Sequence, residues 1–144
     1  MNATILRFGY PASLLHEYES WVVLLRPAQP TLGSLVLACR EDATSLGTVS
    51  AKAYSEIAVA IADLEGALRA TFDPQKLNYL ALMMVDPHVH FHVIPRYSTT
   101  REFEGSTFAD STWPKPPDVT GALPVTKPQM TALHAVLKAA WPRQ

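Results

Sequence analysis

The segment His88–Arg96 reads HVHFHVIPR, and its first half has a histidine at every second position. Successive side chains of a β-strand point to opposite faces. An extended backbone here therefore aims the three imidazoles one way and the intervening apolar residues the other. The apolar face belongs against a core, and the imidazole row then faces a cleft or solvent. We expect a strand over residues 88–97 and build the fold outward from it.

The residues before this strand predict an antiparallel partner. An apolar run over 77–85 reads as a strand, and only Asp86-Pro87 separates it from the histidines. So short a link joins antiparallel strands, because parallel neighbours need a crossover of about a dozen residues or more. Other expected strands are short and apolar or β-prone: 4–8, 14–18, 20–26 and 34–40.

Apolar residues at spacings of three and four predict a long helix over 48–71, with Ser50 as its N-cap and Asp73-Pro74 after its end. A last helix is expected over 128–141, capped by Thr126. Between them, residues 98–124 hold four of the twelve prolines and show no period, which is typical of a functional, partner-bound or mobile loop. The order of elements predicts an α+β domain with a mostly antiparallel sheet.

Composition excludes several classes of protein. The chain has 144 residues, 48% hydrophobic and 17% charged, which suits one globular domain. Its net charge of −1 does not favour a binder of nucleic-acid polymers, although a local basic site stays open. The longest apolar run, 79–85, is far short of the roughly 20 residues of a membrane span, and no signal peptide is evident. The single cysteine, Cys39, excludes an internal disulfide. We expect a soluble cytoplasmic domain.

A row of imidazoles has two chemical uses. Neutral imidazole is available near pH 7, because its unperturbed pKa is about 6.5, and it can attack phosphorus to form a covalent intermediate. Flanking histidines could then donate to phosphate oxygens or to the leaving group. The other use is metal binding, but residues four apart on a strand lie about 13.5 Å from each other, so one ion could take only two of the three. The third possibility is that the three histidines lie on the surface and have no chemical function.

The segment resembles the motif of the histidine triad (HIT) family, His-x-His-x-His followed by apolar residues, and Val-Ile-Pro-Arg is typical of the family. Pro11-Ala12 and the order of strands and long helix also fit. The resemblance covers about 4–97. We therefore assign 1–97 to a HIT-like domain core, and 98–144 to a Pro-rich loop and helix that pack on or extend the same domain.

The resemblance implies an α+β fold with a five-stranded antiparallel sheet, and usually a homodimer. Together with the helices expected from the sequence, the fold has one long helix and a C-terminal helix. A row of three imidazoles suits an anionic phosphate without requiring a metal, and no cofactor is expected. The resemblance also implies nucleotide hydrolysis or nucleotidyl transfer at an α-phosphate. By residue it makes His90 the nucleophile, with His88 and His92 orienting it and contacting phosphate. The carbonyl of His88 is expected to hold the His90 ring in its reactive tautomer.

Substrate-binding residues follow from the same resemblance. The base pocket is expected at four apolar or aromatic positions of the first segment and the second strand: Ile5, Tyr10, Leu24 and Leu25. Arg26 stands where many relatives have a residue that accepts from the ribose. Since a guanidinium only donates, Arg26 meets a phosphate or is a solvated charge. Arg96 is a candidate replacement for a phosphate-binding loop that is missing before His88.

Two departures from the family pattern concern that loop and the link before the third strand. Asp86 lies just before the motif and would repel an anionic substrate, and Ser34 replaces a common histidine. Two alternatives to an enzyme therefore stay open. One is a non-catalytic nucleotide-binding domain, and the other is a metal-binding module that uses the histidine row.

Overall fold

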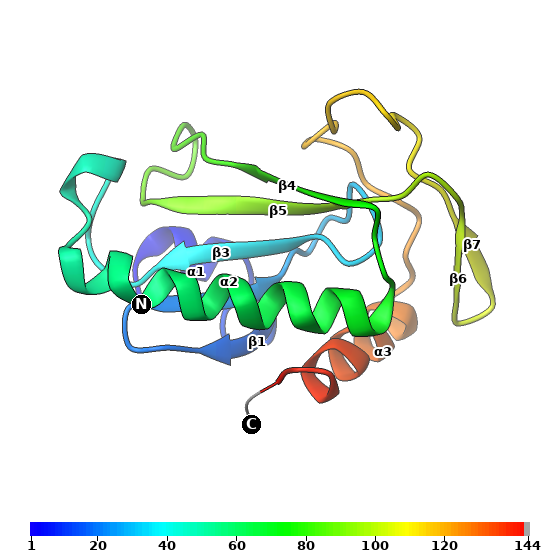
Figure 1. Cartoon of the computed structure of the whole chain (residues 1–144), viewed down its shortest axis with the longest axis horizontal. Helices are drawn as coiled ribbons and strands as arrows, with labels where there is room; N and C mark the ends of the chain where they lie inside the picture. Colours follow the sequence, from blue (N-terminus) through cyan, green and yellow to red (C-terminus); the bar gives the residue numbers. More distant parts are fainter. Residues whose placement is uncertain (143–144) are drawn as a thin grey trace.

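The computed structural model describes residues 1–142 and is built on a five-stranded antiparallel sheet with the order β1-β2-β3-β5-β4 (Figure 1). Its strands are β1 (Leu14–Glu17), β2 (Trp21–Leu25), β3 (Leu35–Cys39), β4 (Lys76–Leu80) and β5 (His90–Arg96). The helices are α1 (Ala3–Arg7), η1 (Leu46–Thr48), α2 (Ala51–Thr71) and α3 (Lys127–Ala139). A separate hairpin consists of β6 (Arg101–Phe103) and β7 (Ser106–Phe108). The predicted α+β class is confirmed.

The strand with the histidines lies inside the sheet and not at its edge. β5 pairs with β3 on one side, where His90 faces Ala38 and His92 faces Val36. On its other side it pairs with β4, the edge strand. Because β5 is hydrogen-bonded on both sides, its side chains keep a fixed direction, which is the condition for a preorganised site.

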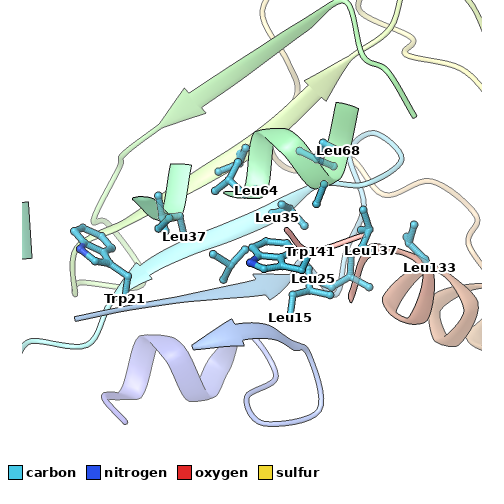
Figure 2. Close-up of a cluster of buried hydrophobic side chains, with 14 of the residues drawn as sticks. Leu15, Trp21, Leu25, Leu35, Leu37, Leu64, Leu68, Leu133, Leu137 and Trp141 are labelled. Carbon is cyan, nitrogen blue, oxygen red and sulfur yellow. The ribbon is translucent and has the colours of Figure 1, made fainter. Parts of the chain in front are cut away.

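Alternation along β2 separates two apolar layers. Trp21, Val23 and Leu25 belong to the main core, whereas Val22 and Leu24 belong to a smaller cluster on the other face. Figure 2 shows the main core between the sheet, α2 and α3. The smaller cluster includes Ile5 and is therefore the layer beneath α1. The long helix and the C-terminal helix thus cover one face, and the short first helix covers the other.

The long helix begins where its cap was predicted. The Ser50 hydroxyl accepts a hydrogen bond from the Ala53 amide, and the Glu41 carboxylate accepts from both the amide and the hydroxyl of Ser50. The Trp21 indole, fully buried, donates to the carbonyl of Ala53 at 2.8 Å. These contacts fix the start of α2 against β2.

Two of the predicted strands were wrong. Residues 4–8 were predicted β-prone, but they lie in and just after α1, because the Asn2 side chain caps a first turn whose apolar residues pack on the sheet. The strand predicted over 77–85 ends at Leu80, and irregular backbone with a positive φ at Met83 continues to Val89. The antiparallel pairing of β4 and β5 is nevertheless as predicted.

The segment after β5 is tied to the sheet through Arg96. Its guanidinium forms a buried ion pair with Asp110, with Nε and Oδ2 2.7 Å apart. The last helix has the predicted Thr126 cap, and Leu133 and Leu137 lie fully buried in the main core. No helix within residues 1–142 combines the length and the apolar character that crossing a bilayer requires.

Candidate active site

His90 and His92 lie side by side on the face of the sheet that α1 covers. Their ring centroids are 5.0 Å apart and their planes are nearly perpendicular. Both residues are buried, with His90 2% and His92 7% exposed. Side chains two apart on a strand share a face, so the regular backbone of β5 brings the two rings together.

The His90 ring is held in one tautomer by the main chain. Its Nδ1 lies 2.7 Å from the carbonyl oxygen of His88. A carbonyl only accepts, so Nδ1 carries the proton and Nε2 carries the free electron pair. The expected contact between the His88 carbonyl and this ring is present, and Nε2 is left with the free electron pair.

The His92 ring has the opposite tautomer. Arg26 Nε lies 3.3 Å from its Nδ1, and since a guanidinium only donates, Nδ1 must accept. Burial, and after it the charges of Arg26 and His90, lowers the pKa of His92 to about 4, against an opposing effect of Asp86. At neutral pH His92 is therefore uncharged, and its only ring proton is on Nε2.

The His88 ring is already satisfied within the chain. Its Nε2 lies 2.8 Å from Asp42 Oδ1 and its Nδ1 3.1 Å from Thr4 Oγ1, while the Thr4 hydroxyl also receives the backbone N–H of His88. The resemblance implies that this ring contacts phosphate. In the structure both ring nitrogens have protein partners, and the backbone carbonyl of His88 contacts the His90 ring.

The two remaining ring nitrogens retain contact with solvent. Within residues 1–142, neither Nε2 of His90 nor Nε2 of His92 has a hydrogen-bond partner. In that part of the chain, Asp86 Oδ1 is the only fully buried side-chain nitrogen or oxygen without a hydrogen bond, and it forms an ion pair with Arg7. The Nε2 atoms therefore keep some exposed area although both residues are buried, and a lone pair and an N–H donor lie on adjacent rings.

An apolar wall adjoins these rings. Ile5 and Leu24 are fully buried in the cluster beneath α1, and Tyr10 packs against it with its hydroxyl on Glu17. The structure therefore brings these three predicted pocket residues together. Phe8 completes the wall, with its ring centroid 5.5 Å from that of His90 and 5.8 Å from that of His92.

Leu25 and Arg96, by contrast, do not join the site. Leu25 lies in the main core on the opposite face of the sheet, because successive residues of β2 alternate. Arg96 donates to five acceptors of its own chain, on Asp110, Asn78, Thr112 and Lys115, and is 3% exposed. The structure thus corrects both substrate-binding assignments, because neither side chain is free to meet a ligand.

The charged residues around the histidines are paired with protein groups. Arg26 is partly buried, and its terminal nitrogens donate to the carbonyls of Ala28 and Val119. Asp86 Oδ1 lies 3.0 Å from Arg7 Nε, and this ion pair joins the irregular segment 81–89 to the end of α1. Within residues 1–142, no group of three or more His, Cys, Asp or Glu side chains could hold a metal ion.

Sequence reasoning missed Phe8, Thr4 and Asp42 as site residues. Phe8 could have been found from the sequence, because it lies three residues after Ile5, a spacing that places two side chains on one face of a helix. Thr4 and Asp42 carried none, because they lie 84 and 46 residues from the histidine that they bind.

Solved structures are similar to this chain over nearly its whole length. A histidine triad protein from Bradyrhizobium japonicum is 19% identical with a TM-score of 0.74, and the match covers 98% of this chain and 96% of that one. A histidine triad protein from Sinorhizobium meliloti is 18% identical with a TM-score of 0.74, and the match covers 97% of this chain and 95% of that one. A hypothetical histidine triad nucleotide-binding protein from Sulfolobus tokodaii is 15% identical with a TM-score of 0.68, and the match covers 95% of this chain and 88% of that one.

No protein-family model and no curated protein matches the chain. At the identities of the solved structures, similarity establishes the fold. This architecture is the histidine triad fold. The resemblance seen in the sequence is therefore confirmed at the level of the fold.

Proposed function

We propose that this protein is a nucleotide hydrolase or nucleotidyl transferase that acts at an α-phosphate through a nucleotidyl-His90 intermediate. The observation that carries the proposal is the pair of complementary nitrogens: a lone pair on His90 Nε2 beside an N–H on His92 Nε2. One atom can attack phosphorus while the other donates to an oxygen of the same group. A neighbour of the same fold is described as a nucleotide-binding protein, which agrees with this substrate class.

In the first half-reaction the His90 Nε2 lone pair forms an N–P bond with the α-phosphorus. The bond from phosphorus to the leaving group breaks, and its electron pair departs with that group. The His90 ring now carries a positive charge, which the carbonyl of His88 stabilises by accepting from Nδ1–H.

In the second half-reaction water or another acceptor attacks the same phosphorus. The N–P bond breaks and its electron pair returns to Nε2 of His90, while the acceptor's proton passes to solvent. His92 Nε2–H donates to a non-bridging oxygen in both steps, where negative charge accumulates. Phe8 and Tyr10, which are partly exposed and pack on the fully buried Ile5 and Leu24, offer a surface for the nucleobase.

The proposal is tested by turnover of a panel of dinucleoside polyphosphates with wild type and His90→Gln. Loss of the covalent route predicts a decrease in kcat of at least about 1,000-fold, with the free energy of AMP binding little changed by calorimetry. Wild-type turnover by His90→Gln would refute the mechanism. Binding of AMP without turnover in the wild type would favour a non-catalytic nucleotide-binding domain, and stoichiometric metal in the purified protein would favour a metal-binding module.

We further propose a homodimer, following the resemblance, and a cytoplasmic location, following the composition of the chain. Sedimentation of the purified chain at micromolar concentration tests the first point, and a monomer would contradict it. Fractionation of the source cells tests the second.

A further inference from the structure

Arg26, directly after β2, holds the His92 ring from one side. Its Nε is 3.3 Å from His92 Nδ1, and its two terminal nitrogens each lie 2.7 Å from a carbonyl oxygen, those of Ala28 and Val119. These carbonyls come from the link after β2 and from the segment before α3. Because three acceptors fix the guanidinium, it cannot rotate away from the imidazole without losing hydrogen bonds.

This contact is incompatible with a protonated His92. An imidazolium has N–H groups on both nitrogens, so its Nδ1–H would point at the Nε–H of Arg26. Two donors cannot share a hydrogen bond, and two positive charges at this distance repel in a site where His92 is only 7% exposed. Other charged groups near the ring do not reverse this, since His90 is a base of the same kind and the Asp86 carboxylate lies against Arg7.

His92 can therefore donate a hydrogen bond from Nε2, but it cannot deliver a proton as a general acid at neutral pH. The distinction determines which leaving groups can depart. The bridging oxygen of a phosphoanhydride leaves with its electron pair as a phosphate anion, which is stable without a proton. The nitrogen of a phosphoramidate must first receive a proton, because an amide anion is too basic to leave.

We propose that Arg26 is a specificity-determining residue, which directs this site to phosphoanhydrides, with a phosphate or nucleoside polyphosphate as leaving group, and against phosphoramidates. This inference rests on the proposed function and narrows its substrate class. In the favoured reaction, the N–P bond to His90 forms as the P–O bond breaks, and no protein group supplies a proton. General acids contribute about 10²–10⁴-fold, so the preference for the anhydride has that order of magnitude.

The test compares two substrates that carry the same nucleotidyl group, diadenosine tetraphosphate and adenosine 5′-phosphoramidate. Wild type is expected to show a kcat/KM at least about 100-fold higher for the anhydride at pH 7. Arg26→Met removes the donor and frees His92 to protonate, so the ratio should decrease at least about tenfold, with phosphoramidate cleavage rising as the pH falls. Arg69→Gln, which removes an exposed cation from α2, should leave the ratio unchanged.

Nitrogen-15 NMR of the histidine rings supplies a readout that does not depend on turnover or on folding of a variant. In the wild type His92 should be the Nε2–H tautomer and should not titrate above about pH 5. An imidazolium or Nδ1–H tautomer at pH 7, equal turnover of the two substrates, or an unchanged ratio in a folded Arg26→Met variant would each overturn the inference. If neither substrate is turned over, the proposed function itself fails, and the substrate inference fails with it.

Discussion

The two central imidazoles have different tautomers because their Nδ1 atoms meet different groups: a carbonyl acceptor at His90 and a guanidinium donor at His92. Spacing predicts that these rings share a face, but not which nitrogen each one presents. The partner of His90 was expected from the resemblance, because it is a backbone group two residues away. The partner of His92 could not be predicted in this way. Arg26 lies 66 residues away in the sequence and comes near the ring only because β2, β3 and β5 are neighbours in the sheet.

At the residue scale, burial of a neutral His92 predicts acid sensitivity. Its pKa in the folded protein, about 4, is below the ordinary 6.5, so between these values the unfolded chain binds more protons. Stability contributed by His92 is therefore fully present above pH 6.5 and lost as the pH falls toward 4, by about 3 kcal/mol.

Urea unfolding at pH 7, 5.5 and 4.5 checks this expectation. His92→Gln, which cannot become charged, should lose less stability than wild type between the first and the last of these pH values. Parallel curves for the two proteins would show that His92 does not contribute.

At the scale of elements, length and local caps explain which predictions succeeded. α2 and α3 are long enough to show a helical period, and both begin at the residues predicted as caps, Ser50 and Thr126. α1 has five residues, too few for a period to stand out from β-prone composition. The apolar stretch after Leu80 resembles a strand, yet Val85 and Met84 are 74% and 80% exposed, so hydropathy alone misplaced it.

The cap of α3 gives a prediction at this scale. The Thr126 hydroxyl accepts from the Gln129 amide, and the Gln129 side chain accepts from the Thr126 amide. Thr126→Ala should lower the free energy of unfolding by about 1 kcal/mol. Thr131→Ala, an exposed residue inside the same helix, is the matched control and should cost less than about 0.5 kcal/mol. Equal losses in urea unfolding would argue against the capping box.

At the scale of the whole molecule, we propose that segments 1–97 and 98–144 unfold together. Leu133, Leu137 and Trp141 of the second segment pack in the same core as residues of the sheet and α2 (Figure 2). The period of the last helix predicts its buried face, but its packing partners depend on how the chain returns along the sheet, which the sequence does not show.

The ion pair between Arg96 and Asp110 tests this cooperativity. Burial alone would raise the pKa of Asp110, but hydrogen bonds from Arg96 and the Tyr97 amide hold it below its ordinary value. The side chains are 4% and 1% exposed, so Asp110→Asn leaves a buried guanidinium without its counter-charge and should cost about 3–5 kcal/mol.

Tryptophan fluorescence and circular dichroism should report one shared urea transition for Asp110→Asn, shifted from wild type. Asp118→Asn, at an exposed turn, should unfold almost as wild type does. Two separate transitions would mean that residues 98–144 form an independent unit.

The central claim is that Nε2 of His90 becomes covalently bonded to phosphorus. Rapid mixing of wild type with diadenosine tetraphosphate, an alkaline quench that preserves a phosphorus–nitrogen bond, and mass spectrometry of the peptides test it directly. The account predicts an adenylyl group on the peptide that contains His90, attached to that ring and lost in His90→Gln. Turnover without any adduct, or with the adduct on another residue, would contradict it.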